Sequence, residues 1–293
     1  MKKAQIQNRM TKLHVPCDKL SRLPFIFTAE QFADIITNNR RLGCLEDDEK
    51  TVTPYWLAQC AECANLKPLD AFHREVLFVL ISEYEQGYTN VSIRMTLNAM
   101  TGDEKSRVYK EQFEAIESAV RTLQNTNITV DLSALFKSMP NYRKNCKGSA
   151  RLSGYLLPCH IVDTELNGQK TISIELIAES PLMTVAKIKN QRFTYDTAPL
   201  KIPNQNNTPR TITIKNWLLR RVMLSKKRKL SKKILFKSFY EDCGLKDATR
   251  SAKQHARNFF FDTLDAFKAE GTINGYDIER GTNNAYRSIT IKF

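Results

Sequence analysis

The same order of helical and alternating patterns occurs twice in this sequence, and this repetition limits the possible folds more than any other feature. In the first copy, apolar residues at helical spacing follow Pro68, a second helix ends at Gly102, and a third is predicted from about Tyr109 to Thr126. Two alternating stretches, GYLLPCHIVDTEL and KTISIELIAE, then flank Asn167-Gly168. An Asn-Gly pair between such stretches is the strongest short signal for a β-hairpin.

The C-terminal third repeats this order. The stretch TITIKNWLLRRVML predicts a helix, KKRKL a short strand, and KKILFKSFYEDC a second helix with Ser231 as its N-cap. A third helix is predicted from about Thr249 to Glu270, and TINGYDIE and AYRSITIKF form a hairpin around residues 280–284. Each copy is therefore a helix-turn-helix with a β-hairpin wing, and the predicted fold is α+β with two tandem winged-helix domains.

The chain of 293 residues is long enough for two such domains. We expect an N-terminal helical extension at 1–66, with short helices beginning at Thr28 and Pro54, a first winged-helix domain at 67–190 and a second at 191–293. The N-terminus lacks the apolar segment of a secretory signal, and no apolar run approaches the length of a membrane span. Seven cysteines do not form a disulfide framework. We expect a cytoplasmic protein without a membrane partner.

Positive charge is concentrated in the second copy of the pattern. The whole chain has a formal net charge of +14, and residues 201–293 hold 20 Lys and Arg against 8 Asp and Glu. Between Asp196 and Glu241 there are twelve basic residues and no carboxylate. Such a field attracts polyanions, whereas a surface built only for solubility mixes the two signs. Nucleic acid is the favoured partner, and a membrane surface is disfavoured because the region lacks a wide apolar helical face.

Several enzyme classes lack their motifs here. The sequence has no P-loop, no closely spaced pair of histidines and no D-x-D pair for two metal ions. The acidic run 46–49 reads as a solvated loop, and Cys60 and Cys63 form a C-x-x-C without the second ligand pair that a zinc site needs. We expect no catalytic residues, no metal and no cofactor, and therefore no enzyme.

The predicted third helix of the second domain carries the candidate base-reading residues. Arg250, Lys253, Gln254 and Arg257 repeat at helical spacing opposite Phe260. Arg and Lys donate to guanine, and Gln pairs with adenine, when such a helix lies in the major groove. The alternative interpretation is an ordinary solvated face. The other expected DNA contacts come from the basic stretch and the wing, namely Arg220, Arg221, Lys226, Lys227, Arg228, Lys229, Lys232, Lys233, Lys237, Arg280, Asn283, Asn284 and Arg287.

The corresponding helix of the first domain differs in charge. It carries Glu111, Glu114 and Glu117, which would repel a phosphate backbone. This domain is therefore better suited to protein contact, although Arg143, Lys144, Lys147 and Arg151 in the following loop are available for backbone contacts.

Residues 67–293 resemble the replication initiator (Rep) proteins of plasmids and phages, which have two tandem winged-helix domains. The resemblance rests on this layout, the helix end at Leu97–Gly102, the GYLLP…NGQ hairpin and NWLLRRVMLSKKRKLSKKILFKSFYEDCG. It implies that the second domain makes the main contacts to repeated origin sites in double-stranded DNA. It also implies a homodimer formed through the first domain, which adds auxiliary DNA contacts, and host helicase-loading or initiator proteins as partners.

Two alternatives stay open. A winged-helix transcriptional regulator would use the same domains on duplex DNA, and the sequence does not separate it from an initiator. A metal-dependent primase or nuclease is a different class, which would need carboxylates brought together from distant positions.

Overall fold

The computed structural model describes residues 12–16, 56–59, 69–104, 107–132, 151–166, 169–188, 190–202, 207–227 and 230–293. We call residues 69–176 the first unit. Its elements are α2 (Ala71–Glu85), β3 (Asn90–Ser92), α3 (Ile93–Thr101), α4 (Lys110–Asn125), β6 (Cys159–Leu166) and β7 (Gln169–Leu176), with β4 (Asn127–Asp131) and β5 (Arg151–Tyr155) between α4 and β6.

The second unit comprises residues 207–293. Its elements are α8 (Pro209–Lys226), β9 (Lys233–Leu235), α9 (Phe236–Asp242), α10 (Arg250–Ala269), β10 (Gly275–Arg280), the short 3-10 helix η4 (Thr282–Asn284) and β11 (Tyr286–Lys292). Between the units lie α7 (Pro181–Ile188), β8 (Arg192–Asp196) and the 3-10 helix η3 (Ala198–Lys201).

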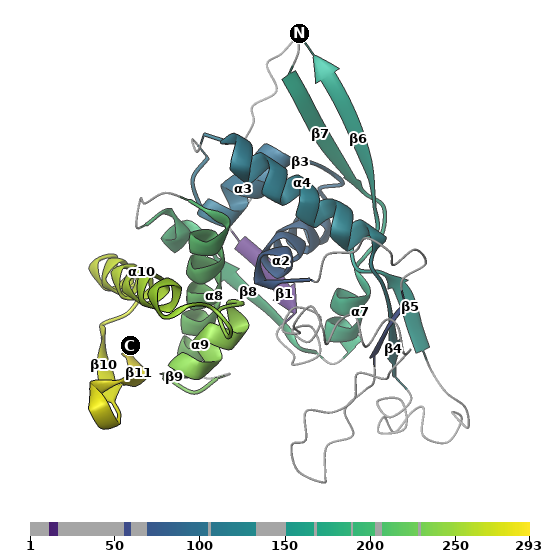
Figure 1. Ribbon diagram of the computed structural model, residues 1–293. Coiled ribbons are helices and arrows are strands. Elements are labelled where there is room, and N and C mark those ends of the chain that lie inside the picture. The colour runs from purple at the N-terminus through teal and green to yellow at the C-terminus, as the bar shows by residue number, and fades with distance from the viewer. Residues whose placement is uncertain are drawn as a thin grey trace, which may run out of the picture.

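The two units have the same sheet order. In each, the last strand of the hairpin is central, pairing with its hairpin partner and with the short strand that precedes the second helix, in the orders β3-β7-β6 and β9-β11-β10. All pairings are antiparallel, and Leu166 opposite Gln169 closes the first hairpin. Both predicted hairpins are confirmed. They lie at opposite ends of the molecule, with the β6–β7 hairpin projecting from the body (Figure 1).

Local sequence explains where the main helices begin and end. The side chains of Asp70, Thr208 and Thr249 accept hydrogen bonds from backbone N–H groups in the first turns of α2, α8 and α10. Gly102 ends α3 with φ 67°, and a Cβ there would lie 2.8 Å from the carbonyl oxygen of Thr197. Glycine is therefore required at this close approach.

Three local predictions are wrong. The helix predicted from Pro54 is not formed at 56–59, because Trp56–Gln59 is strand β2, which pairs with β4. Ser231 is not a helix N-cap; its hydroxyl accepts from the backbone N–H of Lys233, where β9 begins. The short strand is therefore at 233–235 instead of in KKRKL, and Lys226 is the last residue of α8. The helix predicted from Thr28 lies outside the described residues.

An N-terminal strand also joins the fold. β1 (Lys12–Pro16) pairs antiparallel with β8, and it brings Leu13 and Val15 into the core. These strands are about 180 positions apart in the sequence, with His14 opposite Thr194. Part of the predicted extension is thus a strand that packs beneath α2 (Figure 1).

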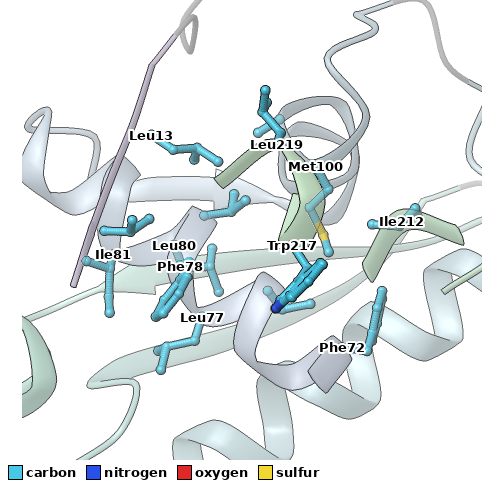
Figure 2. Packing of buried hydrophobic residues seen from close by; sticks show 14 of the residues in the cluster. Leu13, Phe72, Leu77, Phe78, Leu80, Ile81, Met100, Ile212, Trp217 and Leu219 are labelled. Carbon is cyan, nitrogen blue, oxygen red and sulfur yellow. The ribbon is translucent and has the colours of Figure 1, made fainter. Parts of the chain in front are cut away.

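One hydrophobic cluster runs through both units. Side chains of α2, α3 and α8 meet with Leu13 of β1, and Phe78, Met100 and Trp217 lie within this contact (Figure 2). The side chain of Asn216 in α8 also donates to the carbonyl oxygen of Met100 at 2.7 Å. Because α2 and α8 bury their apolar surface against each other, the two units form one continuous core.

A buried ion cluster lies at the contact between α2 and α8. Arg220 of α8 donates two hydrogen bonds to the carboxylate of Glu75, at 2.6 and 2.8 Å, and Arg74 donates two more to the same carboxylate. The three residues are 8%, 2% and 1% exposed for Arg220, Glu75 and Arg74. Burial alone would raise the pKa of Glu75, but the charges of Arg220 and Arg74 lower it below its ordinary value.

Candidate nucleic-acid interface

Helix α10 separates into an apolar face and a polar face, as its periodicity predicts. Ala256, Phe260, Leu264 and Phe267 are buried. Arg250 and Gln254, one turn apart near the N-terminal end, are exposed on the other side. The predicted apolar stripe is confirmed, and the first two turns present Arg250 and Gln254 to solvent. The prediction that Lys253 and Arg257 share this exposed face opposite Phe260 is wrong. Both are half-buried, and Lys253 lies two turns before Phe260 on the same side of the helix.

The polar face of α10 continues onto the hairpin through an aromatic ring. The guanidinium carbon of Arg257, in α10, lies 4.6 Å from the ring centroid of Tyr286 in β11. That of Arg280, at the end of β10, lies 4.4 Å from the same centroid, and Arg280 also donates to the Tyr286 hydroxyl at 3.1 Å. The structure therefore brings together two predicted contact residues that come from different elements.

Lys253 is held closer to its own helix. Its ammonium group donates to the carbonyl oxygen of Lys246 at 2.6 Å and lies 5.7 Å from the ring centroid of Tyr240. It is half-buried, so it contributes positive charge at the edge of the face presented by Arg250 and Gln254.

The hairpin tip is polar and tightly turned. Asn283 has φ 59°, in the left-handed region that Asn tolerates, and it lies with Asn284 in η4. Arg287 is exposed and lies 3.7 Å from the carboxylate of Glu279, which also pairs with Lys233 at 2.5 Å. These hydrogen bonds and charges lower the pKa of Glu279, so the carboxylate stays ionised and offsets part of the positive charge here.

The basic side chains between residues 221 and 237 lie in different environments. Lys226 and Lys237 are exposed. Lys227 donates to the carbonyl oxygen of Thr194 and lies over the Phe193 ring, and Lys232 lies over the Phe293 ring. Arg221 donates to Ser225 and to the carbonyl oxygen of Lys233. Arg228 and Lys229 lie outside the described residues.

The prediction that Arg220 contacts DNA is wrong. Its guanidinium is buried and bonded to Glu75, so it stabilises the contact between the units and does not face solvent. Lys215 is a second basic residue of the same stretch in the interior, and burial lowers its pKa to about 8 although Asp103 acts in the opposite direction. The sequence count of positive charge therefore overstates the charge on the surface.

On the equivalent surface of the first unit, ion pairs join the third helix to the hairpin. Glu117 of α4 pairs with Lys170 of β7 at 2.6 Å, and Arg121 of α4 donates to both carboxylate oxygens of Asp163 in β6. Arg121 also pairs with Glu117. Two cations and two anions thus join helix and hairpin with no excess charge. Arg151 is exposed in β5, and the loop residues Arg143, Lys144 and Lys147 lie outside the described residues.

Among the described residues there is no group of three or more His, Cys, Asp and Glu side chains arranged to hold a metal ion. In the same part of the chain, none of the helices combines the length and apolar character needed to cross a bilayer. Cys60, Cys63 and the acidic run 46–49 lie outside the described residues.

Tyr286 is the residue of this surface that sequence reasoning missed. In the sequence it reads as one aromatic residue at the start of a strand, with no sign of the arginines that surround it. The available signal was its position directly after a turn that begins with Arg280, because residues flanking a hairpin turn lie opposite each other.

Comparisons with known proteins give structural likenesses at low sequence identity. No family model matches the chain, and no curated protein matches it. The crystal structure of RctB domains 2-3 (RctB-155-483) is similar with a TM-score of 0.43 at 10% identity, over 82% of this chain and 87% of that chain. A selenomethionine derivative of RctB domains 2 and 3 is similar with a TM-score of 0.38 at 11% identity, over 89% and 97%. Both TM-scores are below 0.5.

Proposed function

We propose that this protein is a sequence-specific double-stranded DNA-binding protein that initiates replication of a plasmid or phage. The observation that carries the proposal is the surface formed by α10 and the hairpin. Arg250 and Gln254 are exposed near the start of α10, and Arg257 of the same helix shares the Tyr286 ring with Arg280 of the hairpin. Guanidinium and amide groups at the N-terminal end of such a helix are the groups that read base edges in the major groove.

The proposed way of docking is that of a winged helix. The order α8, β9, α9, α10, β10, β11 and the central place of β11 in its sheet support a winged-helix assignment for the second unit. The first unit has the same order and sheet arrangement, which supports a tandem pair. In this arrangement α10 lies in the major groove, while Lys237 of α9 and the hairpin residues contact the phosphate backbone.

The resemblance of residues 67–293 to Rep proteins supports replication initiation over transcription regulation. The charge distribution supports the same division of labour, because the ion-paired surface of the first unit suits protein contact. We further propose a homodimer formed through the first unit, recruitment of host helicase-loading or initiator proteins, and no enzymatic activity of its own. We propose that the protein acts in the cytoplasm.

Footprinting of the full chain on DNA that flanks its gene tests the proposal. Protection of direct repeats beside an AT-rich stretch is the expected result for an initiator. Protection of a single promoter palindrome would favour a transcriptional regulator. Absence of protection on any duplex would contradict DNA binding, and magnesium-dependent nicking or primer synthesis would show an enzyme.

A further inference from the structure

Tyr286 has a fixed position between the core and the surface. Its ring is half-buried and packs on Phe261 at a centroid distance of 5.3 Å and on Phe236 at 5.7 Å. Phe236 in turn contacts the fully buried Phe260 of α10. The ring is therefore anchored to the same aromatic cluster that fixes α10 on its apolar side.

Two cations from different elements meet on this ring. Arg257 approaches from α10 and Arg280 from the end of β10, at 4.6 and 4.4 Å from the ring centroid. Within the described residues Arg257 forms no ion pair with a carboxylate. An aromatic ring attracts a guanidinium group through its quadrupole, so the contact with the ring does not itself neutralise either side chain.

We propose that Tyr286 is a positioning residue that holds Arg257 and Arg280 as one phosphate-binding pair, so that α10 and the hairpin bind the DNA backbone as a single body. The inference rests on the proposed function, and it assigns a role to a residue that neither pattern nor charge singled out. Arg257 lies seven residues after the first residue of α10, away from the N-terminal end that reads bases. Guanidinium groups bind phosphate oxygens in a bidentate manner, which makes the backbone the fitting ligand.

The neighbouring Tyr276 provides a matched control. Its ring stacks on Phe261 at 6.0 Å, so it belongs to the same aromatic cluster, but its hydroxyl donates to Asp265. No arginine lies over the Tyr276 ring in the described part of the chain. Replacing Tyr276 therefore disturbs the packing without disturbing the arginine pair.

The test uses the full chain with Tyr286→Phe, Tyr286→Leu and Tyr276→Leu. Affinity for a random-sequence duplex is measured with the thermal unfolding midpoint of each variant. We expect Tyr286→Leu to weaken binding about two- to fivefold, the size of one exposed cation–π contact. Tyr286→Phe keeps the ring and should bind within about twofold of the unchanged protein. Tyr276→Leu should lower the unfolding midpoint but leave affinity unchanged.

A double-mutant cycle measures the pairing itself. Arg257→Ala and Arg280→Ala should be non-additive in the unchanged protein and additive in the Tyr286→Leu background. Additivity in the unchanged protein would overturn the inference, and this arm does not require that Tyr286→Leu folds. Wild-type affinity of a folded Tyr286→Leu variant, or equal losses for Tyr286→Phe and Tyr286→Leu, would also overturn it. If the unchanged protein binds no duplex, the proposed function fails instead.

Discussion

The two units have the same order of elements, but different contacts join the third helix to the hairpin. In the first unit, Glu117 and Arg121 of α4 form ion pairs with Lys170 and Asp163 of the hairpin. In the second unit, Arg257 and Arg280 share the ring of Tyr286. Both joints fix the helix against the hairpin, but the joint in the first unit contains two carboxylates and the aromatic joint contains none. The chemistry of the joint, and not the topology, separates the two surfaces.

The difference is visible position by position along the helices. Counted from the first residues, Lys110 and Arg250, the fifth position is Glu114 in α4 and Gln254 in α10. The eighth is Glu117 in α4 and Arg257 in α10. Carboxylates replace a neutral amide and a guanidinium on the face that would meet DNA, so α4 is unsuited to the major groove.

The largest expected effect concerns the buried ion cluster at the contact between the two units. Glu75→Met should destabilise the protein by about 3–5 kcal/mol, because it leaves Arg74 and Arg220 buried without their carboxylate. Arg220→Met should cost less, because Glu75 keeps its bonds to Arg74. Denaturant unfolding of both variants measures the difference. Equal stabilities of the two variants would show that the cluster does not join the units as described.

The pH dependence of the same cluster has a definite sign. Because the folded state lowers the pKa of Glu75, its contribution is present above the pKa of the unfolded chain and is lost as the pH falls through the folded value. The acid loss of stability should therefore be smaller in Glu75→Met than in the unchanged protein.

Base reading is expected from α10 and not from α4. Arg250→Ala or Gln254→Ala should each cost about 1–3 kcal/mol on the cognate site and little on random DNA. Glu114→Ala, at the position of α4 that matches Gln254, is the control and should leave both affinities unchanged. Equal losses on cognate and random DNA for Arg250→Ala would mean that α10 does not lie in the major groove.

The substitution Lys215→Met tests whether this buried positive charge contributes to the DNA-binding surface. Its buried ammonium group is disfavoured, so Lys215→Met should stabilise the protein by on the order of 1–2 kcal/mol at neutral pH. Burial lowers the Lys215 pKa to about 8 from 10.5, so the unfolded chain binds the proton more tightly. Stability of the unchanged protein should therefore rise with pH across this window. DNA affinity should not change in Lys215→Met, and a lower affinity would place this charge at the interface.

The smallest expected effect concerns backbone contacts of the second helices. Lys237 is the second residue of α9, and Arg94 is the second residue of α3; both are exposed. Lys237→Ala should weaken cognate and random DNA alike and reduce the salt slope by about one. Arg94→Ala should have no such effect, and the opposite result would assign backbone contact to the first unit.

Helices and hairpins were predictable because their signals are local. The apolar stripe of α10, formed by Ala256, Phe260, Leu264 and Phe267, fixes its orientation within a few turns. β1 was not predictable, since its partner β8 lies about 180 residues away and neither strand has a hairpin signal. Trp56–Gln59 was predicted as helix, but pairing with β4 overrides the weak local propensity.

The types of residue in the candidate site were predictable from the sequence. Which basic residues lie on the surface was less predictable. Helical spacing places Arg250 and Gln254 on one face. The same spacing does not distinguish Arg220 from an exposed arginine, because its partner Glu75 lies 145 residues earlier. Charge counting likewise includes Lys215, which is buried. Tertiary contacts decide which basic residues remain on the surface.

The central claim is that the second unit carries the DNA-binding surface, and a salt series tests it most directly. Affinity for a random duplex is measured at increasing salt for the full chain, for an Arg250→Ala, Gln254→Ala, Arg257→Ala variant, and, as control, for a Lys110→Ala variant at the position of α4 that matches Arg250. The logarithm of the affinity should fall against the logarithm of salt with a slope near −5, as for about five or six phosphate contacts. The α10 variant should have a shallower slope, and the α4 variant should keep the original slope. A flat line for the unchanged protein, or equal slopes for it and the α10 variant, would contradict the account.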